Sequence, residues 1–132
     1  MTIEFFLPMI PPTITHQQKK VTVVGGKPKF YEPQELKEAR AKLRAHLSTL
    51  APEQPIEGAL RLICKWLFPV TSGHADGEYK TTKPDTDNLT KMLKDVMEEL
   101  GFYKNDAQVA SEIIEKFYAE KTGIYIKLEV IG

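Results

Sequence analysis

Three aspartates and one lysine, at Asp85, Asp87, Asp106 and Lys91, are the residues whose types and spacing point most clearly to chemistry. Two carboxylates held close together repel each other unless a cation or a proton lies between them. Hard divalent cations such as Mg²⁺ bind one or two protein carboxylates and complete their shell with water and phosphate oxygens. The sequence therefore predicts a magnesium site that handles phosphates.

The residues around the first two aspartates indicate how they are presented. Pro84 disfavours helical geometry at Lys83 and favours an extended entry into the segment. Residues two apart in an extended segment project to the same side, so Asp85 and Asp87 can point toward one position. Both side chains are thus expected to face a single cation.

A helix over residues 88–100 is expected to follow, because apolar residues recur at steps of three and four along it. Asp87 is then placed at the N-cap or one residue from it. Lys91 falls one turn into the helix, on the side to which Asp87 projects. Asp95 shares a helix face with Lys91 and is predicted to be a supporting partner or outer ligand, whereas Asn88 is predicted to hold the turn together.

Each of these residues also has a purely structural interpretation. Asp85 or Asp87 alone would be an ordinary helix cap, and Lys91 could simply pair with Asp87 or Asp95, which contributes little stability at an exposed site. The combination of the aspartate pair with Lys91 and Asp106 favours the metal site. In that interpretation Lys91 is a cation beside the scissile phosphate that stabilises charge developing in the transition state.

The run DTDNLTK at residues 85–91 and the block GFYKNDAQV at residues 101–109 resemble the RusA family of Holliday junction resolvases. The patterns of that family are D-x-D-N-L-x-K and G-F-x-x-D-D-x-Q-V. Asp106 corresponds to the essential third aspartate of the family. Asn105 departs from the pattern, which has an acidic residue there. The resemblance is dense over residues 83–109 and weaker over the rest of the chain, whose length is that of the family.

This resemblance implies a magnesium-dependent endonuclease that resolves four-way DNA junctions in recombination and repair, with Mn²⁺ as a substitute metal. It implies that the carboxylates of Asp85, Asp87 and Asp106 hold one or two metal ions. It further implies a homodimer that makes paired symmetric cuts. Two alternatives stay open: a less selective nuclease acting on branched or flap DNA, and a non-catalytic DNA-structure-binding protein in which the carboxylates are caps.

The composition is that of one soluble globular domain spanning residues 1–132, with 42% hydrophobic and 27% charged residues. No apolar run approaches the roughly 18 residues that a membrane span needs, and no basic region precedes the apolar N-terminal residues as in a signal peptide. The single cysteine, Cys64, is expected to be a buried thiol in a reducing compartment. We therefore expect a cytoplasmic protein without a membrane partner.

The net charge is zero, but its distribution is uneven. Residues 1–50 hold eight Lys/Arg against four Asp/Glu, and residues 51–132 hold ten against fourteen. Local clusters, rather than the total charge, set the field that DNA meets. The predicted DNA contacts are Lys19, Lys20, Lys27, Lys29, Lys80 and Lys83. The first four lie in an expected hairpin, where lysines can equally protect an exposed strand edge.

The expected fold class is α+β, a mostly antiparallel sheet with two helices packed on one face. Besides the helix 88–100, the expected elements are a strand over 2–7, a hairpin of strands 21–24 and 27–31, a helix of roughly 33–50 with Pro33 in its first turn, and strands over 60–68, 108–119 and 124–130. The last two strands are expected to form a C-terminal hairpin through residues 121–123. A loop of about 70–83 is expected to be mobile and to touch the substrate.

Overall fold

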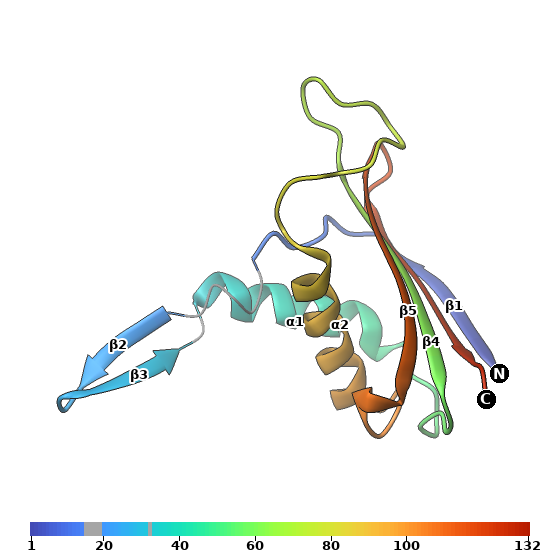
Figure 1. Ribbon diagram of the computed structural model, residues 1–132, viewed down its shortest axis with the longest axis horizontal. Coiled ribbons are helices and arrows are strands. Elements are labelled where there is room, and N and C mark those ends of the chain that lie inside the picture. The colour runs from blue at the N-terminus through green and yellow to red at the C-terminus, as the bar shows by residue number, and fades with distance from the viewer. Residues whose placement is uncertain (15–19, 32) are drawn as a thin grey trace.

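The computed structural model describes residues 1–14, 20–31 and 33–132 (Figure 1). Its elements in chain order are β1 (Thr2–Leu7), β2 (Lys20–Val24), β3 (Lys27–Tyr31), α1 (Gln34–Ser48), β4 (Leu60–Pro69), α2 (Thr86–Glu99), the short 3-10 helix η2 (Asp106–Gln108), β5 (Val109–Ala119) and β6 (Gly123–Val130). Neither α1 nor α2 is long and apolar enough to cross a membrane, and no other helix in the described ranges is either.

The main sheet has four strands in the order β1-β6-β4-β5. β6 runs antiparallel to both β1 and β4, whereas β5 runs parallel to β4. The helices α1 and α2 lie against one face of this sheet (Figure 1). The expected α+β class, with a mostly antiparallel sheet and two helices on one face, is confirmed.

The expected C-terminal hairpin is wrong, because β5 and β6 do not pair with each other. β4 lies between them, and residues 120–122 step across its end. β4 pairs with β5 on one edge and with β6 on the other, and its alternate residues are buried because one face lies on the core. Two strand spacings amount to about 10 Å, which three linking residues can span. The central place of β4 in the sheet therefore keeps β5 and β6 apart.

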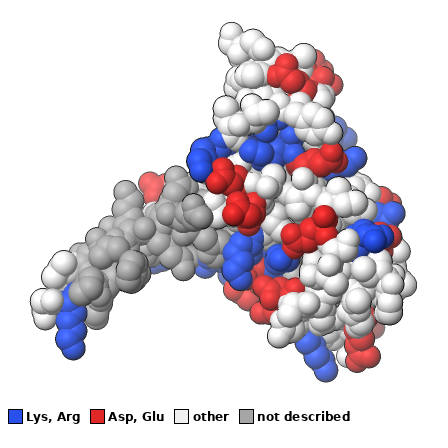
Figure 2. All heavy atoms as spheres, in the orientation of Figure 1, with Lys and Arg blue, Asp and Glu red and all other residues white. Residues whose placement is uncertain are grey.

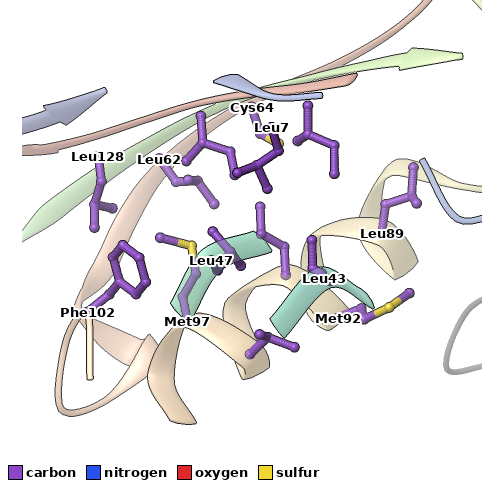
Figure 3. Close-up of a cluster of buried hydrophobic side chains, with 14 of the residues drawn as sticks. Leu7, Leu43, Leu47, Leu62, Cys64, Leu89, Met92, Met97, Phe102 and Leu128 are labelled. Carbon is purple, nitrogen blue, oxygen red and sulfur yellow. The ribbon is translucent and has the colours of Figure 1, made fainter. Parts of the chain in front are cut away.

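The core lies between the helices and the sheet (Figure 3). Leu43 and Leu47 of α1 and Met97 of α2 are fully buried there, beside Leu62 and Cys64 of β4. α1 begins one residue later than expected, because Pro33 has extended backbone angles and stands at the N-cap position. Burial of these two helical faces fixes α2, and with it the acidic motif, against the sheet.

The C-terminus of α2 is closed by Gly101, whose φ of +83° is available to glycine without strain. The amide of Phe102 donates to the carbonyl of Met97 at 3.0 Å, and the amide of Gly101 donates to that of Glu98 at 3.1 Å. These two bonds form a Schellman motif. The chain therefore turns back sharply after the helix, which brings η2 beside the side chains of α2.

β2 and β3 form a separate two-stranded arm that projects from the body of the molecule (Figure 1). Gly25 and Gly26 at its tip both have positive φ, as two-residue hairpin turns of type I′ require. The expected hairpin is confirmed.

Candidate active site

The first two aspartates lie at the N-terminal end of α2. Asp85 has extended backbone angles and occupies the N-cap position, and its carbonyl accepts from the amide of Leu89 at 3.1 Å. Asp87 is already in the first helical turn, so its expected N-cap role is wrong. The extended segment ends at Asp85 and does not include both aspartates. Both carboxylates nevertheless lie where the helix dipole favours negative charge.

Lys91 connects the first part of the motif, residues 85–91, to the second part, residues 101–109, through Asp106. Its Nζ lies 3.0 Å from Oδ1 of Asp95 and 3.6 Å from Oδ2 of Asp106. The hydrogen bond to Asp95 is the main cause that raises the pKa of Lys91, and Asp106 adds to it. Lys91 therefore stays protonated beside Asp106, as an electrostatic role requires.

Asp106 begins η2, and the residues around it hold that helix in place. The Oδ1 of Asn105 accepts from the amide of Ala107 at 2.8 Å, while the Oε1 of Gln108 accepts from the amide of Asn105 at 3.2 Å. This reciprocal pair is a capping box. The Nε2 of Gln108 also donates to the carbonyl of Ile56 at 2.9 Å. Because an amide oxygen caps as well as a carboxylate does, Asn105 is structurally adequate where the family pattern has an acid.

Glu98 is a site residue that sequence reasoning missed. Its Oε1 accepts from the backbone amide of Asp106 at 2.6 Å. Glu98 lies one helical turn beyond Asp95 and two beyond Lys91, so the three share one face of α2. That spacing was the signal in the sequence that could have identified it.

Tyr103 lies beneath this group of acids. Its hydroxyl donates to the carbonyl of Lys94 at 2.8 Å. Burial is the main cause that raises the pKa of Tyr103 well above its usual range, and the negative charges of Asp106 and Glu98 raise it further. Tyr103 therefore remains a neutral donor and supports the helix that carries Lys91.

Lys116 of β5 is a second residue that sequence reasoning missed. Its Nζ donates to the carbonyl of Thr82 at 2.7 Å and to that of Pro84 at 2.8 Å. Burial, followed by the charge of Lys80, lowers its pKa, while Asp85 acts in the opposite direction. No local pattern marks this lysine, because its role depends on the pairing of β5 with β4.

The loop lysines predicted to contact DNA lie beside the acidic motif. The Nζ of Lys83 is 2.9 Å from Oδ2 of Asp85. The Nζ of Lys80 donates to the hydroxyl of Thr82 at 2.8 Å and lies over the rings of Phe68 and Tyr118. Figure 2 shows basic and acidic side chains gathered side by side between this loop and the body.

Three of the other four lysines predicted to contact DNA lie in the arm formed by β2 and β3. Lys27 is exposed at the start of β3, and Lys20 and Lys29 belong to the two strands of the arm. Lys19 lies outside the described residues. The DNA contacts of all six predicted lysines stay predictions, and so does the mobility of the loop.

Within the part of the chain that the structure describes, no group of three or more His, Cys, Asp or Glu side chains is gathered around a common point to hold a metal ion. The three aspartates of the motif therefore do not form a closed triad. Asp85 and Asp106 each face a lysine ammonium, so both carboxylates are already in contact with a cation. Carboxylate oxygens suit a hard divalent ion, which needs only one or two of them when water and phosphate supply the rest.

The family model described as Endodeoxyribonuclease RusA matches residues 9–129, which include both helices and every residue of the acidic motif. The chain belongs to the RusA family. Crossover junction endodeoxyribonuclease rusA of Lactococcus phage r1t is 32% identical over 127 residues, covering 95% of this chain and 94% of that protein. The Uncharacterized protein YqaN of Bacillus subtilis (strain 168) is 26% identical over 122 residues, covering 84% of this chain and 85% of that protein. The protein described here is thus an endonuclease of this family. The resemblance seen in residues 83–109 is confirmed.

Proposed function

We propose that this RusA-family protein is a magnesium-dependent endonuclease that resolves four-way DNA junctions by paired symmetric cuts in recombination and repair. The observation that carries the proposal is the position of Lys91, 3.6 Å from Asp106 and one helical turn along α2 from Asp87. A cation of α2 thereby lies beside the carboxylates of Asp95 and Asp106, a combination that suits phosphodiester cleavage.

The carboxylates of Asp85, Asp87 and Asp106 are the proposed metal ligands, and Mn²⁺ is expected to replace Mg²⁺. When bound, such an ion lowers the pKa of a bound water and neutralises charge on the leaving oxygen. Mg²⁺ needs only one or two protein carboxylates when water and phosphate oxygens supply the rest, so we propose that phosphate oxygens of the substrate complete the coordination. Asp95 and Glu98 orient their neighbours in this group, and Asn88 supports the turn.

Lys91 has a separate role in this proposal. Asp95 holds its ammonium at 3.0 Å, so the cation is fixed before substrate arrives. A preorganised cation beside the scissile phosphate stabilises the transition state without the cost of reorganising water. Lys91 is thus proposed to act on the chemical step rather than on binding.

DNA affinity is proposed to come from the lysines. Lys80 and Lys83 lie at the entrance to the acidic motif, and the arm carries further lysines away from the body. Neutralising phosphates with these side chains makes affinity fall as salt rises. We also propose that the protein acts in the cytoplasm, a reducing compartment that suits the single free thiol of Cys64.

The experiment that tests this function is cleavage of end-labelled synthetic DNA in the presence and absence of Mg²⁺. A four-way junction, a flap and a linear duplex of matched sequence are compared, and Asp85→Asn controls for contaminating nuclease. We expect the junction alone to be cut efficiently, at symmetric positions on two strands. Equal cutting of the flap would favour the less selective nuclease, and tight binding without metal-dependent cutting would favour the non-catalytic binder.

A further inference from the structure

Lys116 connects the edge strand β5 to the segment that carries the first aspartate. Its ammonium donates to the carbonyls of Thr82 and Pro84 at 2.7 and 2.8 Å, across 34 and 32 residues of chain. A lysine ammonium has three N–H donors, and two are used here on backbone oxygens. Pro84 immediately precedes Asp85, so the second of these hydrogen bonds is made one residue from a proposed metal ligand.

The rest of the loop is attached to the same strand by backbone bonds. The amide of Lys80 donates to the carbonyl of Lys116 at 2.9 Å, and the amide of Tyr118 donates to that of Glu78 at 2.8 Å. These bonds fix residues 78–80 against β5. The side chain of Lys116 extends the attachment to Thr82 and Pro84, the last part of the loop before the helix.

Bringing a lysine ammonium out of water costs free energy that hydrogen bonds must offset. Thr82 is exposed and Pro84 is buried, so Lys116 supplies a hydrogen-bond donor to the carbonyl of a buried residue. The same contact bears on the path of the chain into Asp85, which has extended angles with φ −75° and ψ 148°. It therefore determines where the Asp85 carboxylate lies relative to α2.

We propose that Lys116 is a positioning residue, which holds the turn 82–84 so that Asp85 is oriented for the divalent metal. This inference rests on the proposed function, because it assumes that Asp85 is a ligand. It assigns to the edge strand β5 a direct part in building the site.

A simpler role would be that of a nearby positive charge, and the two roles predict opposite effects on metal affinity. If Lys116 acts only through its charge, removing that charge lowers repulsion of a dication and strengthens metal binding. If Lys116 acts by holding the turn, its loss releases Asp85 and weakens metal binding, although a positive charge has been removed. The sign of the change separates the two.

The test is a titration of the DNA-free protein with Mn²⁺. Electron paramagnetic resonance measures the concentration of free Mn²⁺ at each step. We expect Lys116→Met to raise the Kd for Mn²⁺ by about tenfold, the usual effect of losing a residue that orients a ligand. Lys116→Arg keeps the charge and the N–H donors, so we expect it to restore most of the affinity. Lys65→Met is the matched control, since Lys65 is an exposed lysine on the helix-free face of neighbouring β4.

An unchanged or lower Kd in Lys116→Met would overturn the positioning role, and so would a Lys116→Arg protein as weak as Lys116→Met. Circular dichroism at the titration temperature establishes that each variant is folded. If Lys116→Met is not folded, Lys116→Gln takes its place, because its shorter amide cannot span the same distance and should also raise the Kd.

The parent and Asp85→Asn proteins distinguish failure of this inference from failure of the proposed function. If the parent binds Mn²⁺ more tightly than Asp85→Asn does, and Lys116→Met matches the parent, only the role of Lys116 is rejected. If the parent and Asp85→Asn bind Mn²⁺ equally, the proposed metal site is rejected and the role of Lys116 with it.

Discussion

At the residue scale, Asp106 is held at both its backbone and its side chain. Its amide donates to Glu98 at 2.6 Å, and its carboxylate faces Lys91. We expect Glu98→Ala to lower the cleavage rate by about tenfold, because the start of η2 loses the acceptor that orients it. Glu98→Gln keeps an acceptor oxygen and should cleave faster than Glu98→Ala.

Single-turnover cleavage of a labelled junction measures this effect. Glu99→Ala is the control, since Glu99 is the next residue of α2 and pairs with Arg44 on the exposed surface. Such a pair contributes little to stability, so Glu99→Ala should cleave like the parent. Equal rates for Glu98→Ala and Glu99→Ala would show that Glu98 does not position Asp106.

Asn105 stands where the family pattern has an acid, and the structure shows it as the cap of η2. Its side-chain oxygen caps η2, so Asn105→Ala should lower the free energy of unfolding by about 1 kcal/mol. Because it is not a proposed ligand, cleavage should stay within about tenfold of the parent, or about 1.4 kcal/mol of barrier. Urea unfolding and junction cleavage measure the two quantities. A collapse of cleavage comparable to that of Asp106→Asn would mean that Asn105 is itself a ligand.

Substitution of the proposed metal ligands should abolish cleavage without weakening DNA binding. Their carboxylates repel the DNA backbone when no metal is present, so Asp85→Asn, Asp87→Asn and Asp106→Asn should each bind a junction at least as tightly as the parent. Each should fail to cut it, because the site that stabilises developing charge is displaced or emptied. Lys91→Ala should bind nearly normally and cut poorly.

Gel-shift and cleavage assays on the same junction measure both properties. Lys80→Ala and Lys83→Ala serve as the contrast, since we expect weaker binding with a shallower salt dependence. A folded Asp85→Asn protein that resolved junctions at the parental rate would falsify the assignment of the ligands.

At the scale of the elements, β6 begins so close to the end of β1 that no side chain fits at Gly123. A Cβ added there would lie 2.6 Å from the carbonyl oxygen of Leu7 and 2.1 Å from the Cζ of Phe6. A ring can rotate, but the backbone carbonyl of a paired strand cannot move away cheaply. We expect Gly123→Ala to lower the free energy of unfolding by about 1–3 kcal/mol, as overpacking does.

Chemical denaturation with urea measures this loss. Gly132→Ala is a matched control, because its added Cβ would meet the nearest heavy atom, the Cβ of Ala59, at an ordinary 3.8 Å. A Gly123→Ala protein as stable as Gly132→Ala would indicate that β1 and β6 are not held in this register.

Local patterns predicted the elements well, whereas contacts between distant elements could not be predicted from them. The helix near 33–50 and the strand near 60–68 follow from periodicity and are observed as Gln34–Ser48 and Leu60–Pro69. The pairing of β5 was wrong, since it depends on β4 occupying the centre of the sheet. Lys116 was missed for the same reason, because its partners are more than 30 residues away.

The motif proposed the residues of the candidate site, whose roles stay predictions, but not their geometry. It named Asp85, Asp87, Lys91 and Asp106, of which the structure places Lys91 3.6 Å from Asp106. It did not predict that the helix begins at Thr86, which removes Asp87 from the N-cap. Two residues of difference in a helix start therefore change which aspartate caps the helix and which projects from it.

At the scale of the whole molecule, the proposed function favours two copies of the chain acting together. A four-way junction has two strands to cut at symmetric positions, and each chain carries a single acidic motif. A two-fold protein meets a two-fold substrate with both motifs in equivalent positions. We therefore expect a homodimer in solution before DNA is added, so that the two cuts follow each other before the junction dissociates.

Multi-angle light scattering of the DNA-free protein measures this directly. One chain has a mass of 15.0 kDa, and we expect twice that mass across the micromolar range. Asp85→Asn is a useful companion sample, because it should keep the mass of the parent while losing cleavage, which separates assembly from chemistry. A mass of one chain at every concentration would contradict the dimer. The two cuts would then have to come from separate encounters with the junction, and nicked intermediates should accumulate during the reaction.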